Sequence, residues 1–396
     1  MVLASSAVSQ PTGRAKPARG SPSQAAPRAV GDVDESARDQ VLAERLTAQL
    51  LAGPPAPDAV AVAGRLLAIQ AQDPRGARLA IRARTSGLSA ADVDRALTED
   101  RSLVVSWLNR GTLHLVRSDD YPWLHALTAP TSLTANARRL AQEGVTPAAA
   151  ERGVAVIERC LAEEGPLART QIRERLQAAD VRTEGQALVH LLQLASLRGV
   201  AVRGPMQGRE HAFALVRDWL GEPAAVDRGA ALAQLARRYL AGHGPATDRD
   251  LARWAGLPLR DARAGIGAIA SELEQGEDGL VDLARRPAAA ELPWPRLLGP
   301  FEPVLLGWTS REALLGSHQG VVTLNGIFRP FALVRGRAAA TWSLHRGKVG
   351  LTPFGRFAPA DAEALEEDAA DVVRFVAEPR QHLASAGGES GRAPAP

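Results

Sequence analysis

Residues 169–215 read RTQIRERLQAADVRTEGQALVHLLQLASLRGVAVRGPMQGREHAFAL, and this stretch decides the expected fold. Residues 169–178 and 184–198 have the apolar spacing of two helices separated by a short polar turn. Residues 200–203 and 211–215 alternate like half-buried strands around a glycine-rich loop. Helix, turn, helix and a two-stranded hairpin is the element order of a winged helix, a common DNA-binding unit.

The same unit recurs along the chain. An Ala/Leu-rich helical pattern ends in Gly-Pro within residues 51–54, 161–166 and 240–245, and another helical pattern follows each time. In the last two passages Ile172 and Leu251 stand at the same distance from the first leucine. The sequence therefore predicts repeated helix-turn-helix units.

The character of the sequence changes after the third repeat. Runs rich in β-forming residues occur at 303–307, 321–325, 328–335 and 338–345. An acidic helix is expected at about 359–376, with its acidic side chains on a solvated surface. We therefore expect a helix-rich α+β fold in which tandem winged-helix domains precede a C-terminal β-rich domain.

The expected domain boundaries follow from these patterns and from the composition of the two ends. Both ends lack large apolar side chains and are expected to be disordered. The boundaries are 1–35 for a basic tail, 36–145 for a first winged-helix-like domain, 146–224 for a second winged helix, 225–295 for a third, 296–380 for the β-rich domain with its acidic helix, and 381–396 for the second tail.

Length and composition limit the class of protein. A chain of 396 residues exceeds one ordinary core and predicts two to four domains. The single cysteine, Cys160, excludes an internal disulfide or a thiolate metal cluster and fits a reducing compartment. No apolar run approaches the about 18 residues of a membrane span. We expect a cytoplasmic bacterial monomer with no membrane partner, which associates with the nucleoid when it is bound to DNA.

The charged residues permit a nucleic-acid partner without requiring one. Of the 47 basic residues only Lys16 and Lys348 are lysines, and the net charge is +3. Arginine forks suit bidentate phosphate recognition, although a high genomic GC content produces the same bias. Residues 1–30 are basic and free of acids, which fits a bacterial extension or an organellar transit peptide.

A pair of glutamines lies in residues 66–75, which read LLAIQAQDPR. Pro74 keeps Asp73 out of the helical region, so the preceding helix is expected to end near Gln70 and the chain to continue extended. Residues two apart on an extended segment share a face, so Gln70 and Gln72 are expected to project together.

Two adjacent carboxamides could bracket one water or one sugar. A carboxamide donates and accepts hydrogen bonds but cannot take a proton as a carboxylate can. Such a site suits a reaction with a good leaving group. The loss of an already cationic, alkylated purine from a nucleoside is a reaction of this kind. Asp73 could assist electrostatically if the strand twists. Paired surface glutamines are, however, most often only solvated.

Other chemistries lack their residues. The eight histidines show no ligand spacing typical of a metal site, and no phosphate-binding P-loop is present, so we expect neither metal nor cofactor. Neither lysine lies near the glutamine motif in sequence, so a Schiff-base lyase step has no evident nucleophile.

Ordered motifs over residues 38–378 resemble a known family. They are QAQDPR at 70–75, WLNRGTLHLV at 107–116 and FEPVLLGW at 301–308, extended by residues 325–326, 336–337 and 341–342. Together they resemble the AlkZ/YcaQ family of winged-helix DNA glycosylases. This chain departs from the family pattern at Ala71, which is small, at Glu302, which replaces a frequent aspartate, and at 81–84, which lack a tryptophan.

The resemblance implies a function and a set of site residues. It implies tandem winged helices that bind double-stranded DNA and remove N-alkylated purines, in some members also bulky adducts or interstrand crosslinks, in DNA repair or in self-resistance to genotoxins. The family motif maps onto Gln70 and Gln72, with Gln72 positioning the attacking water and Gln70 supporting the water or the sugar. The enzyme would be monofunctional, without lyase activity.

Further residues are candidate DNA contacts. Arg110, Thr112 and His114 belong to a turn that leads into a strand, where Thr112 and His114 would face together and Arg110 could reach a phosphate. A structural arginine and a core histidine explain these residues equally well. Arg203 and Arg209 stand where the wing of the second unit would meet phosphate.

Two other functions remain open at this point. The chain could be a non-catalytic winged-helix DNA-binding protein, either a regulator or a lesion-sequestering factor. It could also be a protein-interaction scaffold that uses winged helices without nucleic acid. Salt-dependent DNA binding separates the scaffold from the other two, because phosphate contacts release counterions.

Overall fold

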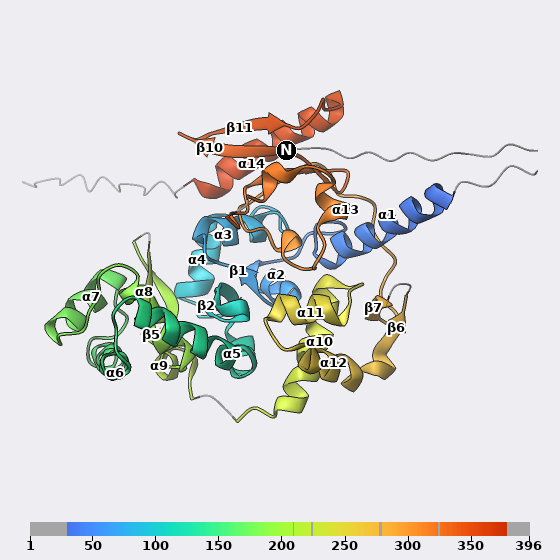
Figure 1. Ribbon diagram of the computed structural model, residues 1–396. Coiled ribbons are helices and arrows are strands. Elements are labelled where there is room, and N and C mark those ends of the chain that lie inside the picture. Colours follow the sequence, from blue (N-terminus) through green and yellow to red (C-terminus); the bar gives the residue numbers. More distant parts are fainter. Residues whose placement is uncertain (1–29, 209, 223–224, 277–278, 324, 378–396) are drawn as a thin grey trace, which may run out of the picture.

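The computed structural model describes residues 30–208, 210–222, 225–276, 279–323 and 325–377 (Figure 1). The two predicted tails lie outside the described residues, except for residues 30–35, which form the start of helix α1 (Val30–Ala48). None of the described helices is long and apolar enough to cross a membrane.

Three successive units build most of the chain, and each has three helices followed by an antiparallel hairpin. In the first, a short strand β1 also follows the first helix. The first unit consists of α2 (Ala59–Leu66), β1 (Ile69–Gln70), α3 (Pro74–Arg82), α4 (Ala90–Thr98), β2 (Leu103–Trp107), the turn η1 (Asn109–Gly111) and β3 (Leu113–Arg117). The turn η2 (Ser118–Asp120) and the long helix α5 (Tyr121–Gln142) connect it to the second unit.

The second and third units repeat this order. The second consists of α6 (Pro147–Glu164), α7 (Arg169–Ala178), α8 (Ala187–Leu197), β4 (Ala201–Gln207) and β5 (Glu210–Leu215), followed by α9 (Val216–Leu220). The third consists of α10 (Arg228–His243), α11 (Asp248–Ala255), α12 (Leu259–Ala268), the turn η3 (Ala270–Glu272), β6 (Leu273–Gln275) and β7 (Val281–Leu283).

The predicted repeat is visible in equivalent contacts. Leu167 and Ala246, each just after a Gly-Pro pair, form an isolated bridge to the second strand of their own hairpin, at Phe213 and Val281. Ile172 and Leu251, which the sequence aligned, are both completely buried or nearly so.

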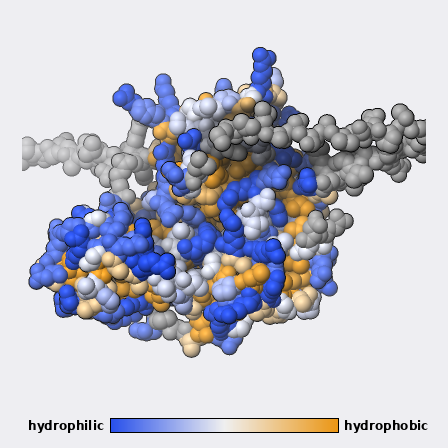
Figure 2. Space-filling view, viewed as in Figure 1, coloured by the Kyte–Doolittle hydropathy of each residue, from blue (hydrophilic) through white to orange (hydrophobic). Residues whose placement is uncertain are grey.

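Hydrophilic side chains cover most of the α6–α7 part of the molecule (Figure 2).

The hairpin of the second unit does not stand free as a wing. It joins the sheet of the first unit through the pair Val105–Arg203, which gives a five-stranded sheet of order β1-β3-β2-β4-β5. Its strands are also longer than predicted, since β4 and β5 include most of the residues expected in the loop. The hairpin of the third unit, in contrast, remains a separate two-stranded sheet.

The C-terminal part is a four-stranded antiparallel sheet of order β11-β10-β9-β8 with one long helix. Its elements are β8 (Arg296–Leu298), η5 (Pro303–Leu305), α13 (Glu312–Leu315), η6 (Gln319–Val321), β9 (Phe331–Val334), β10 (Arg337–His345), β11 (Lys348–Pro353) and α14 (Pro359–Val376). The acidic helix therefore has the predicted bounds.

Two predicted strands are wrong. Residues 303–307 begin a 3₁₀ turn, because Pro303 has no N–H for a sheet ladder and its fixed φ suits the first position of a helix. The described residues of the other run, 321–323 and 325, form no strand either, and an isolated bridge joins Val322 to Phe328. Local β propensity in this region was overridden by proline and by tight turns.

The acids of α14 are not only a solvated surface. The Arg82 guanidinium donates to Asp371 Oδ2 at 2.8 Å and to Asp368 Oδ2 at 2.9 Å, and so fastens α14 to α3. Arg84, two residues on, pairs with Glu302 at 2.6 Å with both side chains fully buried. Removing one partner of such a pair leaves a buried charge alone, at a cost of about 3–5 kcal/mol.

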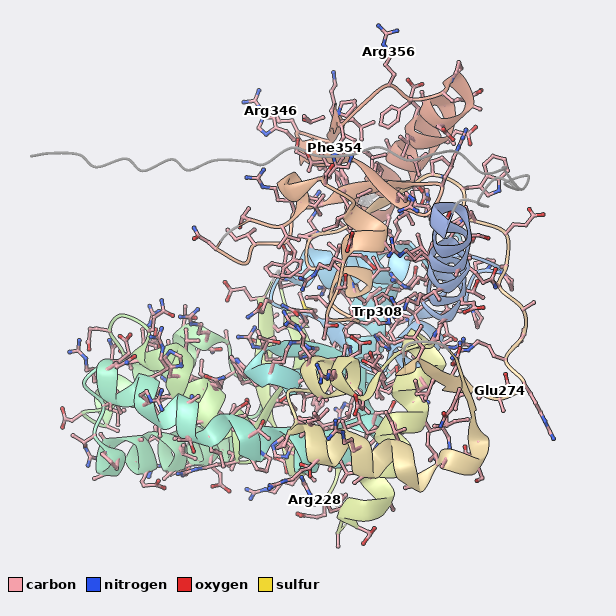
Figure 3. The ribbon with its side chains drawn as sticks, turned by 45° about the vertical axis from the view of Figure 1, so that its right-hand side comes forward. Arg228, Glu274, Trp308, Arg346, Phe354 and Arg356 are labelled. Atoms are coloured by element: carbon pink, nitrogen blue, oxygen red, sulfur yellow. The ribbon has the colours of Figure 1, made fainter. Side chains whose placement is uncertain are left out.

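The third unit and the C-terminal part share an aromatic core. Trp308 (Figure 3) donates from Nε1 to the His243 carbonyl at 2.9 Å, and the Arg45 guanidinium lies 4.7 Å from its ring centre. The rings of Tyr239 and Trp254 pack on His243 at 4.7 and 5.1 Å between centres. This core fixes α10 and α11 next to the turn that precedes β3.

Candidate active site

The glutamine pair lies at the edge of the central sheet. Gln70 Nε2 donates to Gln72 Oε1 at 2.8 Å, so the two side chains share a face as the sequence predicted. Gln70 is buried, with 7% of its surface exposed, whereas Gln72 is exposed. The pair thus has one end anchored in the protein and one end open to solvent.

The backbone around the pair follows from its neighbours. Helix α2 ends at Leu66, earlier than the predicted end near Gln70, because Leu67 adopts a positive φ of 64° and breaks the helix. The extended segment then pairs with β3, with Gln70 opposite His114. Asp73 caps α3 by accepting from the backbone N–H groups of Arg75 and Gly76, both at 2.9 Å, so its carboxylate has a structural partner of its own.

Arg110 reaches the pair from the turn between β2 and β3. Its Nη2 donates to Gln70 Oε1 at 3.2 Å, and its Nη1 donates to the carbonyl oxygen of Trp254 at the end of α11. Arg110 adopts a left-handed conformation with φ 58°, which is uncommon for residues other than glycine. The structure therefore brings Gln70, Gln72 and Arg110 into one hydrogen-bonded row.

The surroundings of Arg110 are positively charged. Burial, followed by the charges of Arg253 and Arg311, lowers the pKa of Arg110 to about 10. Arg110 is still a cation at neutral pH. No sequence motif indicates Arg253 and Arg311, because they lie more than 140 residues further along the chain than Arg110.

Thr112 and His114 have different environments. The Thr112 hydroxyl donates to the Asn109 carbonyl at 3.2 Å, within the turn. His114 is buried beside Gln70 and donates from Nδ1 to the Thr112 carbonyl at 3.0 Å. Burial, followed by the nearby charge of Arg110, lowers the pKa of His114 to about 3. The imidazole is therefore neutral at neutral pH.

Arg203, one of the two predicted wing arginines, lies apart from this row, three strands away from Gln70 in the central sheet. The Arg203 guanidinium lies between two rings, 4.9 Å from the centre of Trp107 and 5.0 Å from that of Phe213. Burial lowers its pKa to about 10. Arg209 is outside the described residues. A phosphate contact by either arginine remains a prediction.

A cavity of about 710 Å³ begins at the residue after Gln72. It is enclosed by the start of α3, the end of the β4–β5 hairpin and the turn between β10 and β11, and its lining includes Asp73, Arg75, Met206 and Arg346. Cavities of 300–1,000 Å³ are typical of sites for small organic groups. Asp73, the residue after Gln72, lines this space, which is large enough for a substantial chemical group, whereas Gln72 itself is not among its lining residues.

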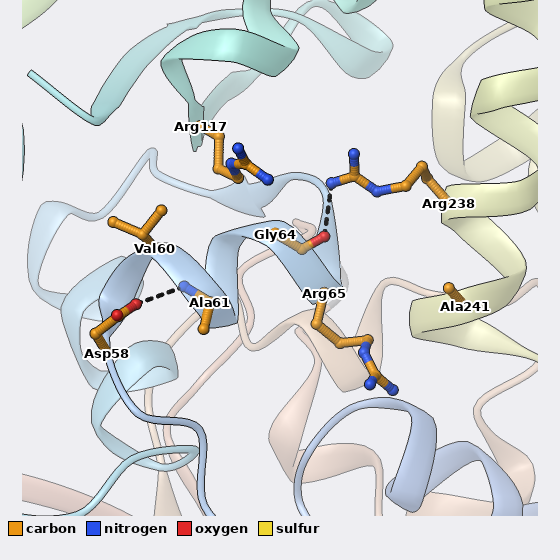
Figure 4. Close-up of a pocket in the computed structure, with 8 residues that line it drawn as sticks. All are labelled: Asp58, Val60, Ala61, Gly64, Arg65, Arg117, Arg238 and Ala241. Carbon is orange, nitrogen blue, oxygen red and sulfur yellow. Dashed lines mark hydrogen bonds between the residues drawn. The ribbon is translucent and has the colours of Figure 1, made fainter. Parts of the chain in front are cut away.

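A second hollow, of about 520 Å³, contains none of the predicted site residues. In Figure 4 Arg117 and Arg238 point toward one another above α2, and Arg238 donates to the Gly64 carbonyl at 2.7 Å. Arg238 also pairs with Asp120 at 2.9 Å, and Arg117 pairs with Asp119 at 2.9 Å. Because these two guanidiniums already have carboxylate partners, the glutamine row is the stronger candidate site.

The described residues contain no group of three or more His, Cys, Asp or Glu side chains placed to hold a metal ion.

Comparisons with known proteins agree with the motifs. The model of a family described as "DNA glycosylase AlkZ-like" matches residues 63–375. An interstrand DNA cross-link repair glycosylase of Streptomyces sahachiroi is 30% identical over 364 residues, which cover 85% of this chain and 95% of the relative. The solved structure of the DNA glycosylase AlkZ of the same organism is similar with a TM-score of 0.72 and 27% identity, over 85% of this chain and 96% of that one.

Proposed function

The chain belongs to the AlkZ-like family of DNA glycosylases, and from that premise we propose that it is a monofunctional glycosylase for alkylated purines in double-stranded DNA. Its substrates are purines made cationic by alkylation at N7 or N3. The observation that carries the proposal is the hydrogen-bonded pair of Gln70 and Gln72, buried at one end and exposed at the other. Repair of such lesions, or self-resistance to a genotoxin, is the corresponding biological role.

The chemistry suits a site without a general acid. A cationic purine leaves with the electron pair of its bond to C1′, which neutralises the base, so the leaving group needs no proton. One water then adds to the oxocarbenium-like sugar at C1′ and releases a proton to solvent. Gln72 orients this water and Gln70 supports Gln72. The neutral, buried His114 is not required as an acid, which agrees with its lowered pKa.

Bulky adducts and interstrand crosslinks are included in the proposal. The Streptomyces sahachiroi relative is named for crosslink repair. The cavity of about 710 Å³ beside Gln72 supports the same range of substrates, because it offers room for a large substituent on the base.

We further propose that the three helix-and-hairpin units act as tandem winged helices around DNA. Arg110 and Thr112 line the lesion site, the buried His114 supports that site from beside Gln70, and Arg203 and Arg209 face the phosphates. Arg253 and Arg311, beside Arg110, add positive charge at the same place. Because such contacts release counterions, affinity for DNA should fall steeply as salt rises.

The experiment measures release of free base from duplex DNA carrying a stable N7-alkylguanine, by purified protein without added metal. Gln72→Ala should slow release by about 100-fold or more, since misplacing a reacting group costs about that much. Gln177→Ala, an exposed glutamine on α7, is the matched control and should leave the rate unchanged. Full activity of Gln72→Ala would contradict the assignment of the water-positioning group.

The products test the absence of a lyase step. We expect an intact abasic site. Lys348 is exposed and follows Gly347, which lines the cavity beside Gln72, so it is the lysine to examine. Strand cleavage, together with a covalent protein–DNA adduct formed on reduction of the Schiff base by borohydride, would show that the enzyme is bifunctional if both occur in the wild type and are lost in Lys348→Ala.

A further inference from the structure

Three hydrogen bonds in a row connect the third unit to the glutamine pair. Arg110 donates to the Trp254 carbonyl at the end of α11 and to Gln70 Oε1, and Gln70 in turn donates to Gln72 Oε1. The last two distances are 3.2 and 2.8 Å. The row begins at the end of a helix in the third unit and ends at an exposed carboxamide of the first.

Arg110 gives this row a direction. A guanidinium has five donors and no acceptor, whereas a carboxamide can turn over and exchange its oxygen and nitrogen. Because Arg110 can only donate, Gln70 must turn its Oε1 to Arg110 and its Nε2 to Gln72. Gln72 must then turn its Oε1 toward Gln70. Only one of the two orientations of each amide satisfies the whole row.

The turn that carries Arg110 is held from two sides. On one side a Cβ at Gly256, which has φ +72°, would stand 2.7 Å from the Arg110 backbone nitrogen, so only glycine allows this contact. On the other side Gln193 of α8 donates from Nε2 to the Gly111 carbonyl at 3.1 Å. The second and third units therefore fix the position from which Arg110 acts.

We infer that Arg110 is a positioning residue, which orients the Gln70 and Gln72 carboxamides for water binding, and that its main partner is not a DNA phosphate. This inference rests on the proposed function of the pair. In the fixed orientation Gln72 Oε1 keeps one lone pair to accept from the attacking water, so the water oxygen stays free to attack. Without Arg110 both amides can turn over, and the pair loses its single arrangement.

The first test compares rates with binding. Arg110→Met should lower the single-turnover rate of base release by about 100-fold at saturating DNA. The dissociation constant for DNA and the slope of its logarithm against that of the salt concentration should stay unchanged. A lost phosphate contact would instead reduce that slope by about 0.9. A reduced slope with a normal rate would overturn the inference in favour of phosphate binding.

The second test asks whether Arg110 acts through Gln70. In a Gln70→Ala background, Arg110→Met should cause almost no further loss of rate, because residues of one network couple in a double-mutant cycle. Arg110→Lys, which keeps a donor, should recover part of the activity. Equal losses from Arg110→Met with and without Gln70 would overturn the inference. Arg175→Met, on the outer side of α7, is the control for general effects of removing an arginine.

A third measurement needs no substrate and keeps the inference separate from the proposed function. In protein labelled with ¹⁵N-glutamine, the side-chain amides of Gln70 and Gln72 should be ordered in the wild type and averaged by rotation in Arg110→Met. Arg110→Leu, which also removes every donor, provides a second variant if the first does not fold, as judged by its thermal unfolding. Ordered amides in a folded Arg110 variant would overturn the inference, whereas a wild type that releases no base would refute only the proposed function.

Discussion

The second and third units have the same order of elements but bury different faces. Every residue of α8 is buried or half-buried, since α5 and α6 pack against it. The corresponding helix of the third unit, α12, has an exposed face that carries Arg260 and Arg263. In a winged helix this is the helix that enters a DNA groove. Of the second and third units, the third presents it to solvent.

The helices that precede them, α7 and α11, differ in the opposite way, because the residue at one aligned position is on the surface in α7 and buried in α11. In the aligned repeat Arg175 of α7 stands where α11 has Trp254. Arg175 is on the surface and pairs with Glu164 at 2.8 Å, whereas Trp254 is buried against Tyr239 and His243. The second unit thus extends the central sheet, and the third unit clamps the Arg110 turn. The same order of elements therefore has a different structural role in each unit, and the position of the apolar face on each helix determines that role.

The largest difference should appear when the two aligned residues are truncated. Trp254→Ala removes a buried aromatic ring and should lower the free energy of unfolding by about 3–5 kcal/mol. Arg175→Ala removes only an exposed ion pair and should change it little. Urea unfolding of both variants measures the contrast. Similar losses would mean that α7 and α11 are equally embedded in the core.

The second prediction compares the fully buried His243 of the third unit with the half-exposed His211 of the second unit as the pH falls. Burial lowers the pKa of His243 to about 3. Between about pH 6.5 and 3 the unfolded chain therefore binds a proton at this residue and the folded chain does not. The free energy of unfolding consequently decreases as the pH is lowered through this range. His243 alone accounts for a loss of about 1.4 kcal/mol of unfolding free energy for each pH unit.

Unfolding by urea at several pH values between 7 and 5 tests this linkage. His243→Phe should reduce the dependence of the unfolding free energy on pH, because phenylalanine does not titrate. His211 of the second unit also has a pKa lowered by burial, but it is half-exposed, so His211→Phe should reduce the dependence less. A larger effect of His211→Phe would reverse the comparison between the two units.

Local signals predicted much of the fold. Helices α7 and α14 have the bounds that their apolar spacing gave, and Pro74 correctly placed Gln70 and Gln72 on one face. The burial of α8 could also have been read from its sequence, because ALVHLLQLASL is apolar on nearly every side. These features depend on neighbours within a few residues.

The remaining features depend on contacts between distant parts of the chain. The pair Val105–Arg203, which joins the second hairpin to the central sheet, connects residues almost 100 positions apart. The contact of Arg110 with the Trp254 carbonyl spans 144 positions and involves a backbone atom, which no side-chain motif reports. The sequence thus predicted which residues to examine, and the tertiary structure supplied the partner that orients them.

The smallest predicted effect concerns the exposed helix of the third unit. The Arg260 side chain is 86% exposed, and its nearest carboxylate, Asp261, is 3.8 Å away. Helix α12 begins three residues after Gly256, which lies against the Arg110 turn. On the proposed function, we expect DNA bound over Gln72 to reach Arg260. Arg260→Ala should therefore reduce the salt dependence of DNA affinity by about one phosphate contact, a slope of about 0.9.

The control is Arg198, which follows the buried helix α8 and already donates to Glu151 at 2.7 Å. Arg198→Ala should leave the slope unchanged, as measured by fluorescence anisotropy with undamaged duplex DNA over a range of salt concentrations. If both variants reduced the slope equally, the second unit would contact DNA as much as the third. The burial of α8 would then not decide how a unit of this kind is used, and exposed arginines outside the helix would carry the binding.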